Sequence, residues 1–387
     1  MKRELVFLLI PLFFIFDSSF GKDISGFTYK NYFEVIPYEV YNNKLIINVE
    51  INGIKRKFLF DTGASTLISK SLFAELNAAI IHKESDRDVF NNKVTIIIVS
   101  LDEIKLGNTI LNDIPVTVAD STQDFFRCGN VEGIIGSDIL CNSIVQISSN
   151  THTITITDEK EKLQLNENNA SKLKLNKYCN PFINITLNTV PIMVALDTGD
   201  DSFFSLSNML MNKLKKEAKN KPFETLSTGY GANSISLFGV EKNKVKYRIR
   251  IPVLQINKGK FKNVIVETSN TIQSDIGAEI LKYGIVTIDY LNKRFYFDCF
   301  ENEKNMEVKK WQISPSVIND QLFVGVIWGQ KKDNINLGDQ IIAIDDINFE
   351  KVDICDLSSL IIKDKEKVTL TLKDKSGIIK QIEIVKE

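Results

Sequence analysis

One pattern occurs twice in this chain of 387 residues, and it constrains the fold more than any other feature. In each copy an alternating segment, a short turn and a second apolar segment lead directly into the tripeptide Asp-Thr-Gly. The copies cover residues 45–68 and 182–206. Alternation of apolar and polar side chains on both sides of a turn is typical of a β-hairpin. Each copy therefore predicts a hairpin whose second strand ends in an aspartate, Asp61 in the first copy and Asp197 in the second.

A second feature repeats in the same order. Residues 133–140 are similar to residues 274–281, and the two stretches share the pairs Ile135-Gly136 and Ile276-Gly277. Two strand-like segments follow each stretch, and the copies of both features are separated by nearly the same number of residues. Two features that recur in one order indicate an internal duplication.

The duplication predicts a mostly β fold with two homologous lobes, at about 28–160 and 172–302, joined by a charged and Asn-rich linker at 161–171. A short helix is expected after each Asp-Thr-Gly, at 70–79 and 207–217. Further strands are expected at 94–101, 110–118, 245–256 and 263–266.

Residues 1–21 have the features of an export signal. Lys2 and Arg3 give a positive start, and the apolar run from Leu5 to Phe16 is shorter than the roughly 20 residues that span a bilayer. The small residues that follow favour cleavage before Lys22. We therefore expect a mature protein without a membrane span that is exported to the periplasm or secreted.

The composition excludes several classes of function. The formal charge is −1, from 48 basic and 49 acidic residues, so the chain lacks the basic surface that a nucleic-acid partner requires. Only His82 and His152 are present, and no HExxH or CxxC spacing occurs. We expect no metal site, no other cofactor and a chemistry that does not depend on histidine.

The five cysteines leave two interpretations open. An exported chain permits disulfides. Pairing within each lobe would join Cys128 to Cys141 and Cys179 to Cys299, and would leave Cys355 over. The alternative is five free thiols, most of them buried.

The repeated Asp-Thr-Gly motif has a chemical consequence. A carboxyl group at the end of an apolar strand is costly unless it is hydrogen-bonded, paired or protonated. Two such groups in matched lobes, Asp61 and Asp197, can face each other, and a pair of this kind shares one proton. The glycines allow a tight turn beside each carboxyl group, and the threonine hydroxyls can fix the neighbouring backbone. The residues expected to support the pair are Thr62, Gly63, Ala64, Thr198, Gly199 and Asp200.

On these motifs the chain resembles the retropepsin/pepsin superfamily of aspartic peptidases in its single-chain, bacterial form. Asp61-Thr62-Gly63-Ala64 is similar to the retroviral-type motif, and Asp197-Thr198-Gly199-Asp200 agrees with it in three of four positions. The family's apolar-apolar-Gly motif, which braces the active-site loop, resembles Ile134-Ile135-Gly136 and, with one polar departure, Asp275-Ile276-Gly277. The resemblance covers about residues 28–302. It implies two retropepsin-like β-barrel lobes around a pseudo-twofold axis, with Asp61 and Asp197 as catalytic acid and base.

Two features qualify the resemblance. Asp200 stands where the family has Ser, Thr or Ala, so it could raise the pKa of the pair, narrow the choice of substrate or mark a lobe that has lost activity. The family also closes a flap hairpin over its cleft, and Gly229, Tyr230 and Gly231 are the candidate tip in the second lobe. An ordinary glycine turn is the alternative there. The equivalent stretch of the first lobe, 88–93, predicts a hairpin without a flap signature.

Residues 311–387 predict a smaller third domain. Strand-like runs follow one another at 322–327, 340–344, 368–372 and 378–385. The stretch 335–347, with a turn, Gly-Asp, a strand and a second turn, resembles the PDZ-domain signature, and a helix is expected at about 356–362. The resemblance implies an α+β module that binds an extended peptide by strand addition. A small β domain that only packs on the lobes is the alternative.

The sequence therefore predicts a monomeric aspartic-type endopeptidase that acts on peptide or protein substrates, with a PDZ-like module for a peptide ligand. A catalytically degenerate peptide-binding protein on the same fold is the main alternative, and Asp200 is the residue that favours it. A glycoside hydrolase also uses two acids, but the motifs do not call for sugar binding.

Overall fold

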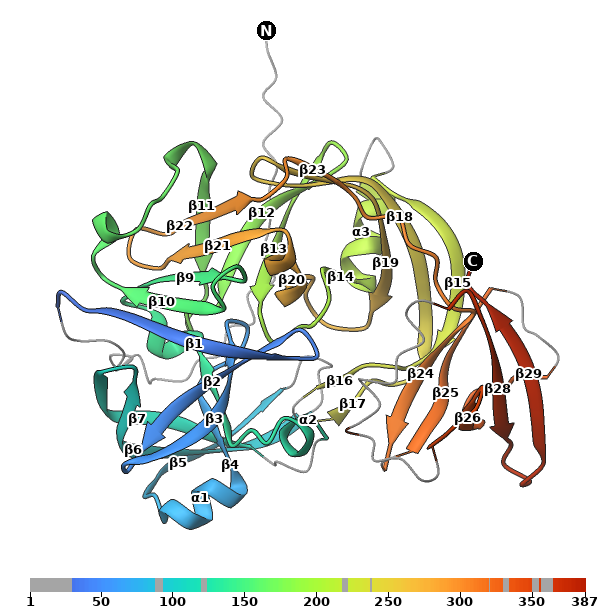
Figure 1. The fold of residues 1–387 in the computed structure, drawn as a ribbon, viewed down its shortest axis with the longest axis horizontal. Helices are drawn as coiled ribbons and strands as arrows, with labels where there is room; N and C mark the ends of the chain where they lie inside the picture. Colours follow the sequence, from blue (N-terminus) through green and yellow to red (C-terminus); the bar gives the residue numbers. More distant parts are fainter. Residues whose placement is uncertain are drawn as a thin grey trace, which may run out of the picture.

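The computed structural model describes residues 30–87, 93–119, 124–217, 222–236, 239–319, 321–329, 334–349, 355 and 365–387. This part of the chain is mostly β with few helices (Figure 1). The expected export signal, most of the expected hairpin turn at 88–93 and the expected helix at 356–362 lie outside the described residues. None of the described helices has the length and apolar character that crossing a bilayer requires.

Six strands of the first half of the chain, residues 30–158, pair in a closed ring. β2 pairs with β3 and β6, β8 lies between β3 and β4, and β7 joins β4 to β6. Every second residue along much of β7 is buried, and these side chains fill the ring together with those of β2. The strands are β2 (Lys44–Ile51), β3 (Ile54–Asp61), β4 (Leu67–Ser69), β6 (Lys93–Leu106), β7 (Thr109–Ala119) and β8 (Gly133–Gly136).

The second half, residues 170–305, contains a ring with the same pattern of pairings. β12 pairs with β13 and β18, β20 lies between β13 and β14, and β19 joins β14 to β18. In both rings the strand that ends in the motif aspartate runs parallel to the Ile-Gly strand, which places Asp61 beside Gly136 and Asp197 beside Gly277. The strands are β12 (Pro181–Leu187), β13 (Val190–Asp197), β14 (Phe204–Ser207), β18 (Lys244–Ile256), β19 (Gly259–Ser269) and β20 (Asp275–Gly277).

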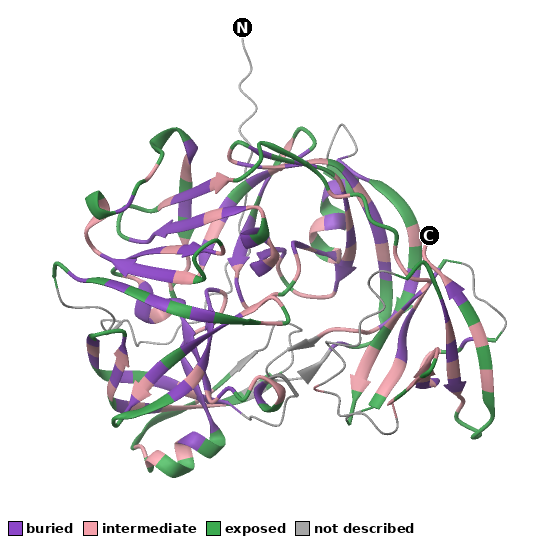
Figure 2. Ribbon diagram, in the orientation of Figure 1, coloured by how far each residue is buried: buried purple, intermediate pink, exposed green. Residues whose placement is uncertain are grey.

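A further sheet joins the two halves. Its order is β1–β10–β9–β21–β22–β11, and β9 of the first half pairs with β21 of the second. Buried residues line these strands, so the sheet is part of the common apolar core (Figure 2). The strands are β1 (Phe33–Tyr41), β9 (Ile144–Ser148), β10 (Thr153–Thr157), β11 (Ala170–Leu175), β21 (Gly284–Asp289) and β22 (Arg294–Cys299).

A helix follows each Asp-Thr-Gly, as expected: α1 (Lys70–Leu76) and α3 (Asn208–Glu217). Both begin in the same way, because the hydroxyl of Ser69 accepts a hydrogen bond from the backbone N–H of Leu72 and that of Ser207 accepts one from Leu210. The smaller elements are β5 (Ile80–Arg87), α2 (Asp124–Cys128), η1 (Ser137–Leu140), η2 (Lys160–Lys162), η3 (Glu167–Asn169), β16 (Ile235–Ser236), β17 (Gly239–Val240), η4 (Ala278–Lys282) and β23 (Glu303–Asn305).

Residues 311–387, here called the C-terminal module, have an apolar cluster of their own. β25 pairs with β24 and β26, and β28 lies between β26 and β29. The strands are β24 (Ile313–Ile318), β25 (Gln321–Trp328), β26 (Gln340–Ile344), β27 (Ile347–Asn348), β28 (Lys367–Lys373) and β29 (Ile379–Val385).

The module continues the sheet of the second half. β15 (Glu224–Gly231) pairs with β18 on one side and with β25 on the other (Figure 1). Gly229 lies opposite Trp328, whose ring stacks on the guanidinium group of Arg248 at 4.6 Å. Arg248 also pairs with Glu267 at 2.7 Å. The expectation of a hairpin tip at Gly229, Tyr230 and Gly231 is therefore wrong, because these residues lie in a strand with partners on both sides.

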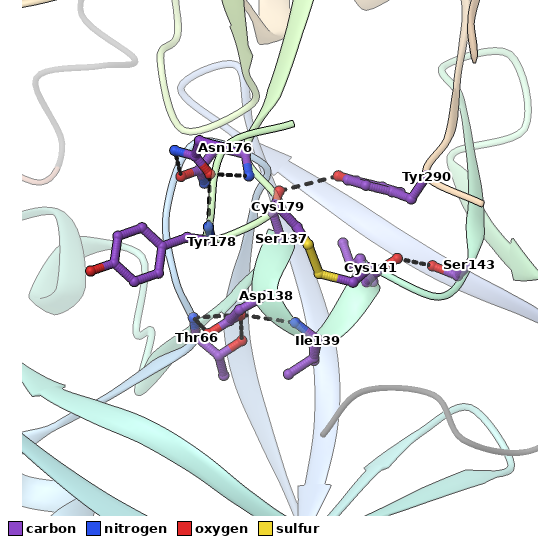
Figure 3. Close-up of a disulfide and its surroundings, with 12 residues drawn as sticks. Thr66, Ser137, Asp138, Ile139, Cys141, Ser143, Asn176, Tyr178, Cys179 and Tyr290 are labelled. Carbon is purple, nitrogen blue, oxygen red and sulfur yellow. Dashed lines mark hydrogen bonds between the residues drawn. A yellow bond between two sulfur atoms is a disulfide. The ribbon is translucent and has the colours of Figure 1, made fainter. Parts of the chain in front are cut away.

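The cysteines correct a second expectation. Disulfides join Cys128 to Cys355 and Cys141 to Cys179, and Cys299 is in neither. Pairing within a lobe and the absence of disulfides are both wrong. Both bonds connect parts that the sequence treats as separate: Cys141–Cys179 links the first half to the second (Figure 3), and Cys128–Cys355 links the first half to the C-terminal module.

Peptide mapping under non-reducing conditions tests these disulfides. We expect two cross-linked peptides, Cys128–Cys355 and Cys141–Cys179, and alkylation of Cys299 in the unfolded, unreduced protein. Replacing Cys141 and Cys179 together by Ser should lower the free energy of unfolding by about 2–4 kcal/mol, since the bond restricts the unfolded chain. Recovery of a Cys128–Cys141 peptide would contradict this arrangement.

Candidate active site

The two motif aspartates meet where the halves face each other. A Cβ atom on Gly63 would overlap the carboxyl group of Asp197, and one on Gly199 would overlap that of Asp61. Each carboxyl group therefore packs on the glycine of the opposite motif. Within its own loop each one accepts a backbone hydrogen bond of 2.8 Å, Asp61 from Gly63 and Asp197 from Gly199. Only glycine leaves the space that this arrangement needs.

The two threonines lock the loops together across the same contact. The hydroxyl of Thr198 accepts from the backbone N–H of Thr62 at 3.0 Å and donates to the carbonyl of Phe60 at 2.8 Å. The hydroxyl of Thr62 accepts from Thr198 N–H at 3.1 Å and donates to Leu196 at 2.7 Å. Both threonines are buried. Four hydrogen bonds thus hold the two carboxyl groups at one fixed separation.

The Ile-Gly residues support the loops from behind. Ile135 and Ile276 are fully buried in the common core. A Cβ atom on Gly136 would overlap the backbone of Ala64, and one on Gly277 would overlap the carbonyl of Ser202. The glycines therefore allow each active-site loop to approach its neighbouring strand closely.

Asp200 binds within its own loop. Its carboxylate accepts hydrogen bonds from the backbone N–H of Ser202 at 2.8 Å and from the hydroxyl of Ser205 at 2.6 Å. Both oxygens are thus engaged by local donors, although the charge still acts on Asp197.

Several residues at the site carry no motif in the sequence. Asn180, in the loop before β12, donates to the carbonyls of Thr62 and Ala64 at 3.3 and 3.4 Å. Lys44, at the start of β2, donates to the carbonyl of Gly199. Each half therefore holds the active-site loop of the other through the turn that precedes its ring. The only sequence signal for Lys44 and Asn180 is that each lies just before one of the two copies of the hairpin.

The Cys141–Cys179 disulfide fixes the loop that carries Asn180. Asn176 accepts backbone hydrogen bonds from Tyr178 and Asn180, both at 2.9 Å (Figure 3). Ser137, in the turn before Cys141, donates to the carbonyl of Thr62 at 2.6 Å. The Cys141–Cys179 disulfide therefore joins two segments, one with Ser137 and one with Asn180, that both contact the loop after Asp61.

The electrostatics of the site favour protonated carboxyl groups. Burial and the neighbouring carboxyl of Asp61 raise the pKa of Asp197 well above its usual value, and Asp275 and Asp200 raise it further. Burial and the charge of Asp200 also raise the pKa of Asp275, to about 8. Asp275 is 5% exposed and was not among the residues expected to act here. Its place in the apolar-apolar-Gly motif was the signal available in the sequence.

Comparison with known proteins supports part of this description. Residues 47–139 match the family model described as aspartyl protease, which supports that family and a protease-like function. No curated protein matches the chain significantly. Conglutin gamma, a basic 7S globulin from lupine seeds, is 12% identical with a TM-score of 0.40, and basic 7S globulin from soybean is 10% identical with a TM-score of 0.39. Each of these two comparisons covers 70% of this chain and 95% of the other, and at such scores neither bears on function.

Replacing Thr198 by Val tests the hydrogen bonds that the threonines form between the two loops. The side chain keeps its shape, but the buried N–H of Thr62 and the carbonyl of Phe60 lose their partner. Each unsatisfied group costs about 1–3 kcal/mol, so we expect a lower unfolding midpoint in urea. The same change at Thr225, an exposed residue of β15, is the control. Equal unfolding midpoints of the two variants would show that the hydrogen bonds of Thr198 do not stabilise the fold.

The raised pKa of Asp275 predicts a stability that falls with pH. The folded protein keeps a proton up to a pKa of about 8, whereas the unfolded chain releases it near pH 4. Between these values the free energy of unfolding should fall by up to about 1.4 kcal/mol per pH unit. Asp275→Asn should flatten this dependence, as measured by urea denaturation between pH 5 and pH 8. Parallel curves for the two proteins would count against a buried, protonated Asp275.

Proposed function

We propose that this protein is an aspartic-type endopeptidase in which Asp61 and Asp197 together activate a water molecule. The packing of each carboxyl group on the glycine of the opposite motif carries the proposal, since it brings two acids from distant parts of the chain into one site. The match of residues 47–139 to the aspartyl protease family supports it. We include in this proposal that the two rings are homologous lobes of a bilobal protease.

The chemistry follows from the shared proton. Two carboxyl groups in contact do not ionise together readily, so near neutral pH one is a carboxylate and the other a carboxylic acid. The carboxylate removes a proton from water, and the water oxygen attacks the peptide carbonyl carbon while the acid protonates the carbonyl oxygen. Transfer of a proton to the amide nitrogen then allows the C–N bond to break. The hydrogen bonds to Gly63 and Gly199 hold both carboxyl groups in place throughout.

We also propose that the C-terminal module is PDZ-like and that the protein is exported. Within the described residues β24 pairs with one strand, β25, and its Pro315 is typical of an edge strand. An extended peptide could add to the other edge of β24. Titration of the full chain with peptides that carry a free or an amidated C-terminus tests this role, and absence of binding to both would oppose it.

Cleavage of a mixed peptide library at pH 4–7, followed by mass spectrometry, tests the proposed activity. Asp61→Asn and Asp197→Asn should each lower the rate by at least about 100-fold, because the pair loses its acid–base function. Asp102→Asn, a change in an exposed carboxyl group of β6, is the matched control and should cleave normally.

The same experiment separates the enzyme from the alternative. Binding of peptides without any cleavage by the unaltered protein would favour a degenerate, peptide-binding role. Cleavage that persists in Asp61→Asn would exclude this pair as the source of activity.

A further inference from the structure

The two rings differ at the positions next to the aspartates. In the first half Ile134 of β8 lies opposite Leu59 of β3 and Leu67 of β4. These three residues belong to a buried apolar cluster that Phe126 of α2 helps to cover. This face of the first ring is therefore closed by apolar packing.

In the second half the same register brings together other residue types. Asp275 of β20 lies opposite Ala195 of β13 and Ser205 of β14. The described segment between β19 and β20 contains no helix, whereas α2 stands between the equivalent strands β7 and β8. Small and polar side chains thus replace the apolar cluster, and a carboxyl group takes the place of Ile134.

Among the described residues, no positively charged group acts on the carboxyl group of Asp275. It is 5% exposed, and Gln273 hydrogen-bonds to the group, but its Oδ1 has no hydrogen-bond partner in the part of the chain that the structure describes. The charged groups that act most strongly on it are the carboxyl groups of Asp200 and Asp61, and it acts in turn on Asp197. A positive ligand group placed here would therefore offset both the desolvation cost of an ionised Asp275 and its repulsion by the neighbouring carboxylates.

The oxygen atoms available as ligands decide which kind of cation fits this site. Asp200 uses both oxygens for hydrogen bonds within its own loop, from Ser202 and Ser205. Among the described residues, no group of three or more His, Cys, Asp or Glu side chains is arranged to hold a metal ion. A divalent metal ion such as Ca²⁺ takes about six to eight oxygen ligands. A single unpartnered carboxylate oxygen instead suits an ammonium or guanidinium group. Asp275 lies opposite Ala195, two residues before Asp197 on β13, so such a group would belong to the substrate residue next to the bond that is cut.

We propose that Asp275 is a specificity-determining residue that binds a Lys or Arg side chain of the substrate beside the scissile peptide bond. This inference rests on the proposed peptide-cleaving function. In the empty site Asp275 is a carboxylic acid. When the cation binds, the O–H bond breaks, the proton passes to solvent, and the carboxylate forms an ion pair with the N–H donors of the substrate.

Matched peptides test this role by cleavage. The peptides differ only in carrying Lys, Arg, Leu or Glu on either side of the scissile bond. In the unaltered protein we expect kcat/KM for Lys or Arg to exceed that for Leu by about 10–100-fold, the value of one charge-assisted hydrogen bond. Asp275→Asn and Asp275→Ile, the latter restoring the residue type of Ile134, should bring this ratio close to one. Asp102→Asn should keep it.

Binding tests the inference independently of catalysis. Fluorescence anisotropy with the full-length Asp61→Asn protein should show the same preference for the Lys peptide over the Leu peptide. Calorimetry at pH 6 in two buffers of different ionisation enthalpy should show release of about one proton with the Lys peptide and none with the Leu peptide.

The outcomes are distinct for the two proposals. No preference for basic residues in the unaltered protein, in cleavage and in binding, overturns the role of Asp275, and so does a preference that survives both substitutions. Selective binding of the Lys peptide without any cleavage leaves the role of Asp275 standing and refutes the proposed catalysis.

Discussion

The structure depends on the contact in which each aspartate of the pair packs on the glycine of the opposite motif. This contact exists only while the two halves remain docked, because Asp61 and Gly199 come from different rings. The pairing of β9 with β21, the threonine hydrogen bonds and the Cys141–Cys179 disulfide all act across the same boundary. A change at this boundary should therefore affect the carboxyl pair before it affects the interior of either ring.

The contact is electrostatically unfavourable in isolation. Two buried carboxyl groups repel each other when both are ionised, and the raised pKa of Asp197 expresses that cost. The surrounding hydrogen bonds offset it, since Gly63 and Gly199 donate to the carboxyl groups and the threonine hydroxyls bind backbone groups of the opposite half. Burial in the docked halves thus keeps one proton in the pair, and that proton is what an acid–base mechanism requires.

Local patterns predicted most of the elements. Alternation and turns gave the duplicated hairpins, and the helices after Asp-Thr-Gly follow from serines that cap them in equivalent positions, Ser69 and Ser207. The features that sequence reasoning missed involve residues distant in the chain. Cys128 and Cys355 are 227 residues apart, and no local signal indicates that they meet. The glycines of β15 resembled a hairpin tip because the sequence did not reveal that β25 would pair with the edge of that strand. Asp275 likewise gains its importance only from the register of β20 against β13, and Asn180 from its contact with the other half.

The two halves keep one framework but use it differently. In the first half, α2 covers an apolar cluster and carries Cys128, whose disulfide holds the C-terminal module. The module is also attached through β25, which pairs with β15 of the second half. The second half, without a helix in the place of α2, retains a buried carboxyl group close to the pair. The two rings can differ in this way because the threonine and glycine contacts, which need both Asp-Thr-Gly motifs, fix the site, while the faces beside them take no part in those contacts. The first half therefore supplies Asp61 and the disulfide attachment of the C-terminal module, whereas the second half supplies Asp197 and the buried Asp275 close to it.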